Sequence, residues 1–481
     1  MTITLAIRNG TIVTDREVTR GDLLIAGDRI AGIVDPGAAI PAEQEVDAGG
    51  RHVFPGFVDG HVHFRDPGQT HRGDFHTESV SAIHGGVTTV IDGPNTGTVV
   101  RYADDVEEKR RIGEAASVVD FGQIAALTPD NVDAIPELVE AGVVAVKIFL
   151  GYKYALSGLP LHPPEDGQLM DALDSVRETG VRLSVHAENG DVITYLRDRF
   201  RKEGRNTYRD HLASRPAYGE ADAISTILRF GEAAGIRMEI RHLSCEEGLP
   251  LVRAAKERGL DIVLETCPHY LLLDSDDLRE QGPLAVINPP VRGEQHPAAL
   301  LGGIRAGIID TIGTDHGPVT DDEKDHENIW DVAPGFSAVE LAVPLLLTLA
   351  EEGELELTDV ARLYAANTAK AWDLYPRKGS LLPGADADVT ICEIGPAWTI
   401  EHSALHGRFT QTPFQGRTAR ARVTDVIAAG QILVRDGELL DDTPRGRMVR
   451  PWFKGAYRFD RLYGPRAMRA AEVREDVAAE V

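Results

Sequence analysis

Cysteine is scarce in this sequence, and its scarcity limits the environment in which the protein works. The 481 residues include three cysteines, Cys245, Cys267 and Cys392, which are widely scattered. So few thiols do not make a disulfide framework, so we expect a protein of the reducing cytoplasm. The first residues, 1–5, lack the basic and apolar segments of a signal peptide, which agrees with that location.

The sequence also lacks a long hydrophobic run and an excess of basic residues. Its longest apolar stretch, residues 341–350, is too short to span a bilayer and contains Pro344. The chain has 50 Lys and Arg residues against 76 Asp and Glu, a formal net charge of −26. This charge disfavours nucleic acid and anionic membranes as partners. A local cation can still bind an anionic small molecule.

Both ends of the chain are rich in short apolar runs typical of strands. Within residues 1–53, Asn9-Gly10 and Gly27-Asp28 separate such runs and predict hairpin turns. Strand patterns return in residues 376–440. With 42% hydrophobic residues, the chain is long enough for a large core and an accessory domain. We expect the two ends to pair in one small β-sandwich.

Residues 54–375 alternate between apolar strands and helix-length segments such as 166–179 and 220–234. Eight such repeats predict an α/β fold, a (β/α)8 barrel of the TIM type. A doubly wound open sheet is the alternative, although no Gly-x-Gly-x-x-Gly motif follows an early strand. The eight predicted strands are Phe57–His63, Val87–Asp92, Ser117–Gly122, Val143–Phe149, Val181–His186, Arg237–Leu243, Asp261–Cys267 and Ile308–Asp315.

The first of these strands ends in a His-x-His pattern. Residues i and i+2 of a strand point to the same face, so His61 and His63 project together. Two neutral imidazoles at a strand end provide two ligands for a metal ion. Asp59 lies on the same face and can orient or supplement them.

Other strands end in residues that can bind metals, and barrel enzymes build their sites at these ends. They are Lys147, His186, His242 and Asp315. A single histidine at a strand end is more often a hydrogen-bonded core residue. The recurrence at successive ends instead predicts a site for zinc or another borderline divalent ion. Lys147 is unusual in such a set, and its alternative role is a buried ion pair with a carboxylate.

The last segment, residues 441–481, is charged and rich in arginine. A disordered tail is one interpretation. Aromatic residues favour the other, a tail that packs on a neighbouring subunit of a homodimer or homotetramer. These aromatic residues are Trp452, Phe453, Tyr457, Phe459 and Tyr463.

Taken together, these motifs resemble the cyclic amidohydrolases: dihydroorotases, allantoinases and hydantoinases or dihydropyrimidinases. The resemblance extends to about residue 440 and implies two divalent metal ions, zinc by default. It implies that Lys147 is carbamylated to N6-carboxylysine, which bridges the ions. The presence of every ligand disfavours the non-catalytic structural or signalling relatives of dihydropyrimidinase, the alternative of another class. The implied ligands are His61, His63, Lys147, His186, His242 and Asp315.

Several motifs point specifically to dihydroorotase. The segments 61–68 and 93–96 are similar to that enzyme, in which the residues matching Arg65 and Asn95 hold the substrate carboxylate. Asn288, in Asn-Pro-Pro-Val-Arg, also resembles dihydroorotase and is a third candidate for substrate binding. Val319 departs from the pattern, because dihydroorotases carry a histidine at this position.

Other motifs resemble hydantoinases and allantoinases. The segment 147–153 is similar to hydantoinases, in which the residue matching Tyr152 polarises the substrate carbonyl, and 265–271 is similar to both groups. We therefore predict an enzyme that hydrolyses a ring C–N bond of a cyclic amide or ureide. Asp315 would transfer the proton and Tyr152 would assist catalysis. Dihydroorotase-like specificity is the first interpretation, with hydantoinase, dihydropyrimidinase or allantoinase activity as the alternative.

Overall fold

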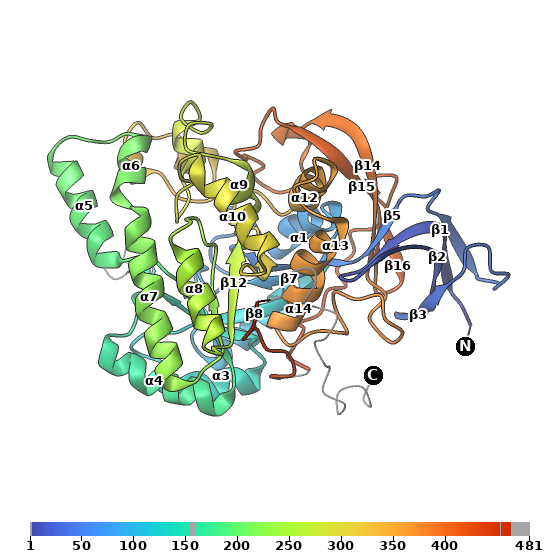
Figure 1. The fold of residues 1–481 in the computed structure, drawn as a ribbon, viewed down its shortest axis with the longest axis horizontal. Helices are drawn as coiled ribbons and strands as arrows, with labels where there is room; N and C mark the ends of the chain where they lie inside the picture. The colour runs from blue at the N-terminus through green and yellow to red at the C-terminus, as the bar shows by residue number, and fades with distance from the viewer. Residues whose placement is uncertain (1, 153–158, 453, 463–481) are drawn as a thin grey trace.

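The computed structural model describes residues 2–152, 159–452 and 454–462, and its core is a barrel of parallel strands (Figure 1). The strands lie side by side in chain order, from β6 to β13. They are β6 (Phe57–Val62), β7 (Val87–Asp92), β8 (Asp120–Ala126), β9 (Ala145–Phe149), β10 (Arg182–His186), β11 (Met238–Ile240), β12 (Ile262–Thr266) and β13 (Thr311–Ile312). A bridge between Val62 and His316 joins the first strand to the segment after the last. The predicted barrel is confirmed, because an open doubly wound sheet would not keep this order.

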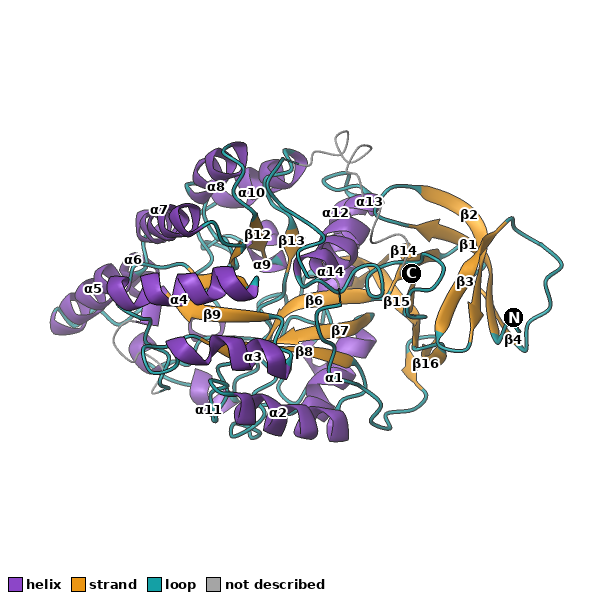
Figure 2. Cartoon of the chain, turned by 90° about the horizontal axis from the view of Figure 1, so that it is seen from below, coloured by secondary structure: helices purple, strands orange, loops and turns teal. Residues whose placement is uncertain are grey.

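Helices surround the barrel strands, which lie in the middle of the view in Figure 2. Among the described residues, none of these helices has the length and apolar character needed to cross a membrane. Their bounds are α1 (Phe75–His84), α2 (Ala103–Ala116), α3 (Ile135–Ala141), α4 (Asp166–Thr179), α5 (Gly190–Lys202), α6 (Tyr208–Ser214), α7 (Ala217–Ala234), α8 (Gly248–Glu257), α9 (Pro268–Leu272), α10 (Gln295–Arg305), α11 (Asp321–Lys324), α12 (Ala342–Glu351), α13 (Leu357–Ala361) and α14 (Asn367–Ala371).

Several predicted strand boundaries were wrong, two of them for a clear local reason. The third strand begins at Asp120 and not at Ser117, because the Ser117 hydroxyl donates to Val119 O and turns the chain there. The last strand stops at Ile312, before Asp315. Asp315 has a positive φ of 51°, in the left-handed region, which is incompatible with an extended strand.

Strands from both ends of the chain form one nine-stranded mixed sheet beside the barrel, with its own hydrophobic core (Figure 1). The Gly27-Asp28 hairpin is present between β2 and β3. Asn9-Gly10 makes no turn: β1 continues through it with a bulge, and Asn9 N donates to Asp22 Oδ1. The strands are β1 (Leu5–Val13), β2 (Val18–Ala26), β3 (Arg29–Val34), β4 (Gln44–Asp47), β5 (His52–Pro55), β14 (Val389–Thr399), β15 (Thr418–Ala428), β16 (Gln431–Arg435) and β17 (Glu438–Leu439).

The described part of the C-terminal segment packs on the barrel of its own chain. Val449 N donates to Phe121 O, and Ile262 N donates to Phe459 O, so the segment adds hydrogen bonds to β8 and β12. Phe459 is 3% exposed. Phe453 and residues 463–481 lie outside the described residues, and contact with a neighbouring subunit stays a prediction.

We predict that Phe459→Ala destabilises the protein by up to about 3–5 kcal/mol, the usual cost of removing a buried phenylalanine. The ring packs against Val263 and Ala371, and its loss would leave a cavity beneath β12. The midpoint of urea unfolding measures the effect. Leu440→Ala is the control, because this side chain, just before the segment, is 57% exposed. Equal midpoints for the two variants would contradict a role for Phe459 in the core.

Candidate metal centre

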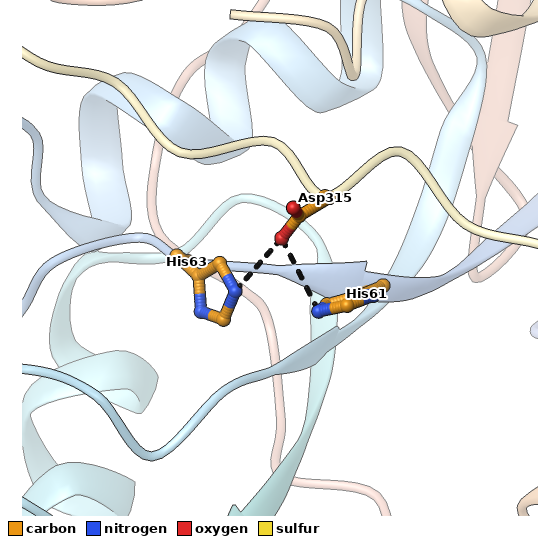
Figure 3. A group of neighbouring side chains, drawn as sticks. All are labelled: His61, His63 and Asp315. Atoms are coloured by element: carbon orange, nitrogen blue, oxygen red, sulfur yellow. Dashed lines mark hydrogen bonds and ion pairs between the residues drawn. The ribbon is translucent and has the colours of Figure 1, made fainter. Parts of the chain in front are cut away.

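Three predicted ligands converge at the barrel edge where β6 ends (Figure 3). His63 Nε2 lies 3.0 Å and His61 Nε2 3.3 Å from Asp315 Oδ1. The three ligand atoms lie within 4.8 Å of one another, both histidines are buried, and the side chain of Asp315 is 11% exposed. Two imidazoles and one carboxylate are a donor set that suits a divalent ion such as zinc.

Asp59 is not part of this cluster but forms hydrogen bonds with the segments that carry it. Its Oδ1 accepts the backbone N–H groups of His61 at 3.0 Å and Thr314 at 3.1 Å. Its Oδ2 accepts the hydroxyls of Thr314 at 2.6 Å and Tyr364 at 2.9 Å. The fully buried carboxylate thus joins β6 to the residue before Asp315, so of its two predicted roles it takes the orienting one.

A second group of predicted ligands lies on the neighbouring strands. His186, at the end of β10, has Nδ1 2.9 Å from Nε2 of His242, which follows β11. Lys147, in β9, has Nζ 3.1 Å from Nε2 of His61, so it connects this pair to the first cluster. All three residues are at most 3% exposed.

The protonation preferences of these groups fit metal binding. Burial lowers the pKa of His63 to about 3 and that of His61 well below its ordinary value, so both rings are neutral at pH 7. Burial alone would raise the pKa of Asp315, but the hydrogen bond with His63 and the nearby His242 and Lys147 lower it overall. Neutral imidazoles with free lone pairs and an ionised carboxylate are the forms that bind metals.

Lys147 has the environment of an uncharged amine. Burial, followed by the charge of Arg241, lowers the pKa of Lys147 to about 7. The ion pair with a carboxylate considered above is absent within the described residues, where no carboxylate oxygen lies within 4.0 Å of Nζ. Its Nζ instead lies 4.8 Å from the centre of the Phe149 ring.

Two buried carboxylates with no predicted role contact the candidate ligands. Glu188 Oε2 lies 2.8 Å from His186 Nε2 and also pairs with Arg215, whose charge helps lower the pKa of Glu188 to about 2. Glu265 Oε1 lies 2.7 Å from His61 Nδ1. The position of Glu188, two residues after His186, could have indicated a shared face. For Glu265, the sequence feature that could have indicated a role was its charge inside the otherwise apolar strand β12.

A cavity of about 570 Å³ opens above the two groups. All predicted site residues except His61 line it, and His61 is fully buried behind it. Its size lies within the range of ligand-binding sites. The structure thus brings the predicted substrate-binding residues Arg65, Asn95 and Asn288 into the same cavity as the candidate ligands.

Arg65 is a buried guanidinium on one wall of the cavity. Its φ is +69°, and Nε donates to Pro318 O at 3.3 Å. Gly317 and Gly335 leave room for it, because a Cβ at those positions would lie 2.6 and 3.3 Å from Nη2. Within the described residues, no carboxylate oxygen lies within 4.0 Å of its nitrogens. Burial lowers the pKa of Arg65 to about 10, which still leaves it charged at pH 7.

Tyr152 lies in the 3-10 turn η2 (Leu150–Tyr152) after β9, and its hydroxyl faces Asn288. Nδ2 of Asn288 is 3.5 Å from the hydroxyl oxygen, and its buried Oδ1 has no hydrogen-bond partner within the described residues. Burial raises the pKa of Tyr152, so the hydroxyl keeps its proton at neutral pH. A phenol donor and an unsatisfied amide oxygen suit a ligand that offers both a carbonyl and an N–H group.

Comparisons with known proteins agree with this geometry. The profile of the amidohydrolase family matches residues 52–433. An allantoinase from Deinococcus radiodurans is 35% identical over 455 residues, which are 94% of this chain and 99% of the relative. A D-hydantoinase from Ralstonia pickettii is 32% identical over 93% of this chain and 98% of its own. The solved structure of an L-hydantoinase (dihydropyrimidinase) from Arthrobacter aurescens superimposes with a TM-score of 0.90 at 29% identity, covering 93% of this chain and 100% of the other.

Proposed function

This chain belongs to the amidohydrolase family, among the hydrolases of cyclic amides, and from that premise we propose that it opens a five-membered ureide or imide ring. The ring would be of the allantoin or hydantoin type, because the relatives named above carry those activities in their names. The observation that carries the proposal is the Tyr152–Asn288 pair in the cavity of the His-Asp cluster. The sequence analysis placed dihydroorotase-like specificity first. The proposal instead adopts its alternative, hydantoinase or allantoinase activity.

The family is metal-dependent, and the donor set fits two divalent ions. His61, His63 and Asp315 would hold the first ion and His186 and His242 the second, and a carbamate on Lys147 would supply a further ligand. When bound, such ions polarise a carbonyl group and make water a nucleophile at neutral pH. Zinc suits this mixture of imidazole and carboxylate ligands, although the same donors bind manganese and cobalt.

The side chains of the cavity would position the ring and move the proton. The Tyr152 hydroxyl would donate to the carbonyl oxygen, on which negative charge develops during attack by water. The Asn288 oxygen would accept a ring N–H group. The Asp315 carboxylate would take the proton of the attacking water and deliver it to the departing ring nitrogen. The low pKa of Asp315 supports the first of these proton transfers, because the group is ionised at pH 7.

A side-by-side assay tests the proposal. The purified, zinc-loaded protein would be incubated with allantoin, hydantoin, dihydrouracil and dihydroorotate, and ring opening followed by loss of ring absorbance and by product analysis. We expect the highest kcat/KM on allantoin or on a hydantoin. A preference for a six-membered ring would overturn the choice. Failure to bind zinc and to hydrolyse any of the rings would favour the non-catalytic relatives.

Arg65 supports a second candidate, a ring that carries a carboxylate, as in dihydroorotate. A buried guanidinium without a carboxylate partner in the described part of the chain can bind one through two charge-assisted hydrogen bonds. Asn95 lines the same cavity and would add a neutral donor. Val319, which is 4% exposed, offers no such contact where dihydroorotases have a histidine.

We predict that Arg65→Met lowers kcat/KM for a carboxylated ring by about 10- to 150-fold, the equivalent of ~1.5–3 kcal/mol for a hydrogen bond to a charged group. Uncharged rings should be much less affected. Arg72→Met is the matched control, because Arg72 lines the same cavity but already pairs with Glu323. An equal loss on charged and uncharged rings would mean that Arg65 serves the fold or the metal centre and not substrate choice.

A further inference from the structure

A row of buried charged side chains lies inside the barrel beneath the candidate metal centre. Glu265, in β12, contacts Arg241 from the segment after β11, and Arg241 in turn contacts Glu239. All three side chains are at most 1% exposed. None of them lines the cavity, so a direct contact with substrate does not explain their presence.

Glu265 is held from several sides, and its carboxylate faces groups that donate. Oε2 accepts Nη1 of Arg241 at 2.8 Å, and Oε1 accepts the backbone N–H of His242 at 3.1 Å. A Cβ at position 313 would lie 2.5 Å from Oε2, so Gly313 leaves the space that the carboxylate occupies. The remaining contact of Oε1 is with Nδ1 of His61, at 2.7 Å.

Arg241 fixes the position of Glu265 by binding two other strands as well. Its Nη1 also donates to Gly60 O at 2.7 Å, and its Nε donates to the Ser184 hydroxyl at 2.8 Å. The guanidinium therefore joins β6 and β10 to the carboxylate from β12.

These contacts determine which nitrogen of His61 carries the proton. A neutral imidazole has one N–H group and one lone pair, and the Glu265 oxygens already accept from Arg241 and from the backbone N–H of His242, so the carboxylate is arranged as an acceptor. Nδ1 must therefore carry the proton that it donates to Glu265, which leaves the lone pair on Nε2. That nitrogen faces Asp315 and Lys147, 3.3 and 3.1 Å away.

We propose that Glu265, held in place by Arg241, is a positioning residue that fixes the tautomer and orientation of His61 for metal binding. The inference rests on the metal centre assigned under the proposed function. Outer carboxylate partners of metal-binding histidines typically change metal affinity by about 10- to 100-fold. The Glu265–Arg241 pair would thus set the occupancy of the site without touching the substrate.

Glu265→Gln tests this role with little change in shape. The amide has one acceptor and one donor group, so it cannot accept from both His61 and Arg241. We expect zinc to bind about 10- to 100-fold more weakly, measured on the metal-free protein by competition with a chromophoric chelator. Glu220→Gln is the matched control: Glu220 is also a buried glutamate that accepts a guanidinium, from Arg292 at 2.7 Å, and a backbone N–H, from Ser244.

An NMR measurement on the wild-type protein keeps the test independent of how well the variant folds. With ¹⁵N-labelled histidine, the residue-assigned signals of His61 should show a proton on Nδ1 in the metal-free protein. A proton on Nε2, or zinc affinity in Glu265→Gln within twofold of wild type, would overturn the proposal. A wild-type protein that binds zinc but opens no ring would instead refute the proposed function and leave this inference standing.

Discussion

Replacing Asp315 by asparagine is expected to lower kcat by about 10²- to 10⁴-fold, the usual contribution of a positioned acid–base group. The variant should keep the fold and part of the metal. The amide retains the oxygen that lies 3.0 Å from His63 Nε2, so the local geometry has a near-isosteric substitute. The asparagine amide cannot take up a proton at neutral pH, whereas the low pKa of Asp315 keeps the native carboxylate ionised.

The measurement is kcat on the preferred ring at saturating zinc, together with metal content and the midpoint of thermal unfolding. Asp331→Asn is the matched control, because Asp331 lines the same cavity but its side chain is 51% exposed at the rim. We expect that variant to retain wild-type kcat within a few-fold. Turnover near the wild-type value in a fully metal-loaded Asp315→Asn would remove Asp315 from the catalytic step.

The convergence of the site was predictable from the order of the strand ends. In a parallel barrel the carboxyl ends of all strands lie at one edge, so Lys147, His186 and the pair His61 and His63 had to meet there. Strand alternation added that His61 and His63 share a face. These arguments need only the sequence, because they depend on periodicity and chain order.

The positions of His242 and Asp315 were less predictable, because tertiary contacts determine them. The sequence indicated extended strands through both residues, yet each has a positive φ just beyond its strand, at 39° and 51°. Thr314, next to Asp315, is held by Asp59 across the seam where the barrel closes. No local pattern in residues 308–315 encodes a contact with a residue more than 250 positions earlier in the chain.

The partner of each buried charged residue could not be predicted from the sequence either. Glu265 and Arg241 are 24 positions apart, and their pairing depends on the register of β11 against β12. The sequence analysis therefore used residues 265–271 only as a family motif and predicted no role for Glu265. A charged residue inside an apolar barrel strand signals that a partner exists, since an unpaired buried charge is very costly. It does not identify that partner.

Lys147→Ala is expected to bind less than the full complement of two metals and to lose more kcat/KM than the ~10–100-fold typical of an outer contact. The variant would lack the proposed carbamate between the two groups of ligands. Metal analysis and activity on the preferred ring measure both effects. Acetate or propionate should restore part of the activity by supplying a carboxylate to the vacated space. Two tightly bound metals with full activity in Lys147→Ala would refute the bridging role.

The chain offers a matched control in Lys324. This lysine is also buried, donates to Val286 O at 3.0 Å, and has a pKa lowered to about 7 by burial and Arg65. If burial and an uncharged amine sufficed for carbamylation, both lysines would react with CO₂. Only Lys147 lies beside candidate metal ligands, which would retain the carbamate. In protein equilibrated with ¹³C-bicarbonate, a carbamate signal should therefore vanish in Lys147→Ala and persist in Lys324→Ala. Loss of the signal in Lys324→Ala alone would place the carbamate on Lys324 and not on Lys147, and would refute the proposed bridge between the metals.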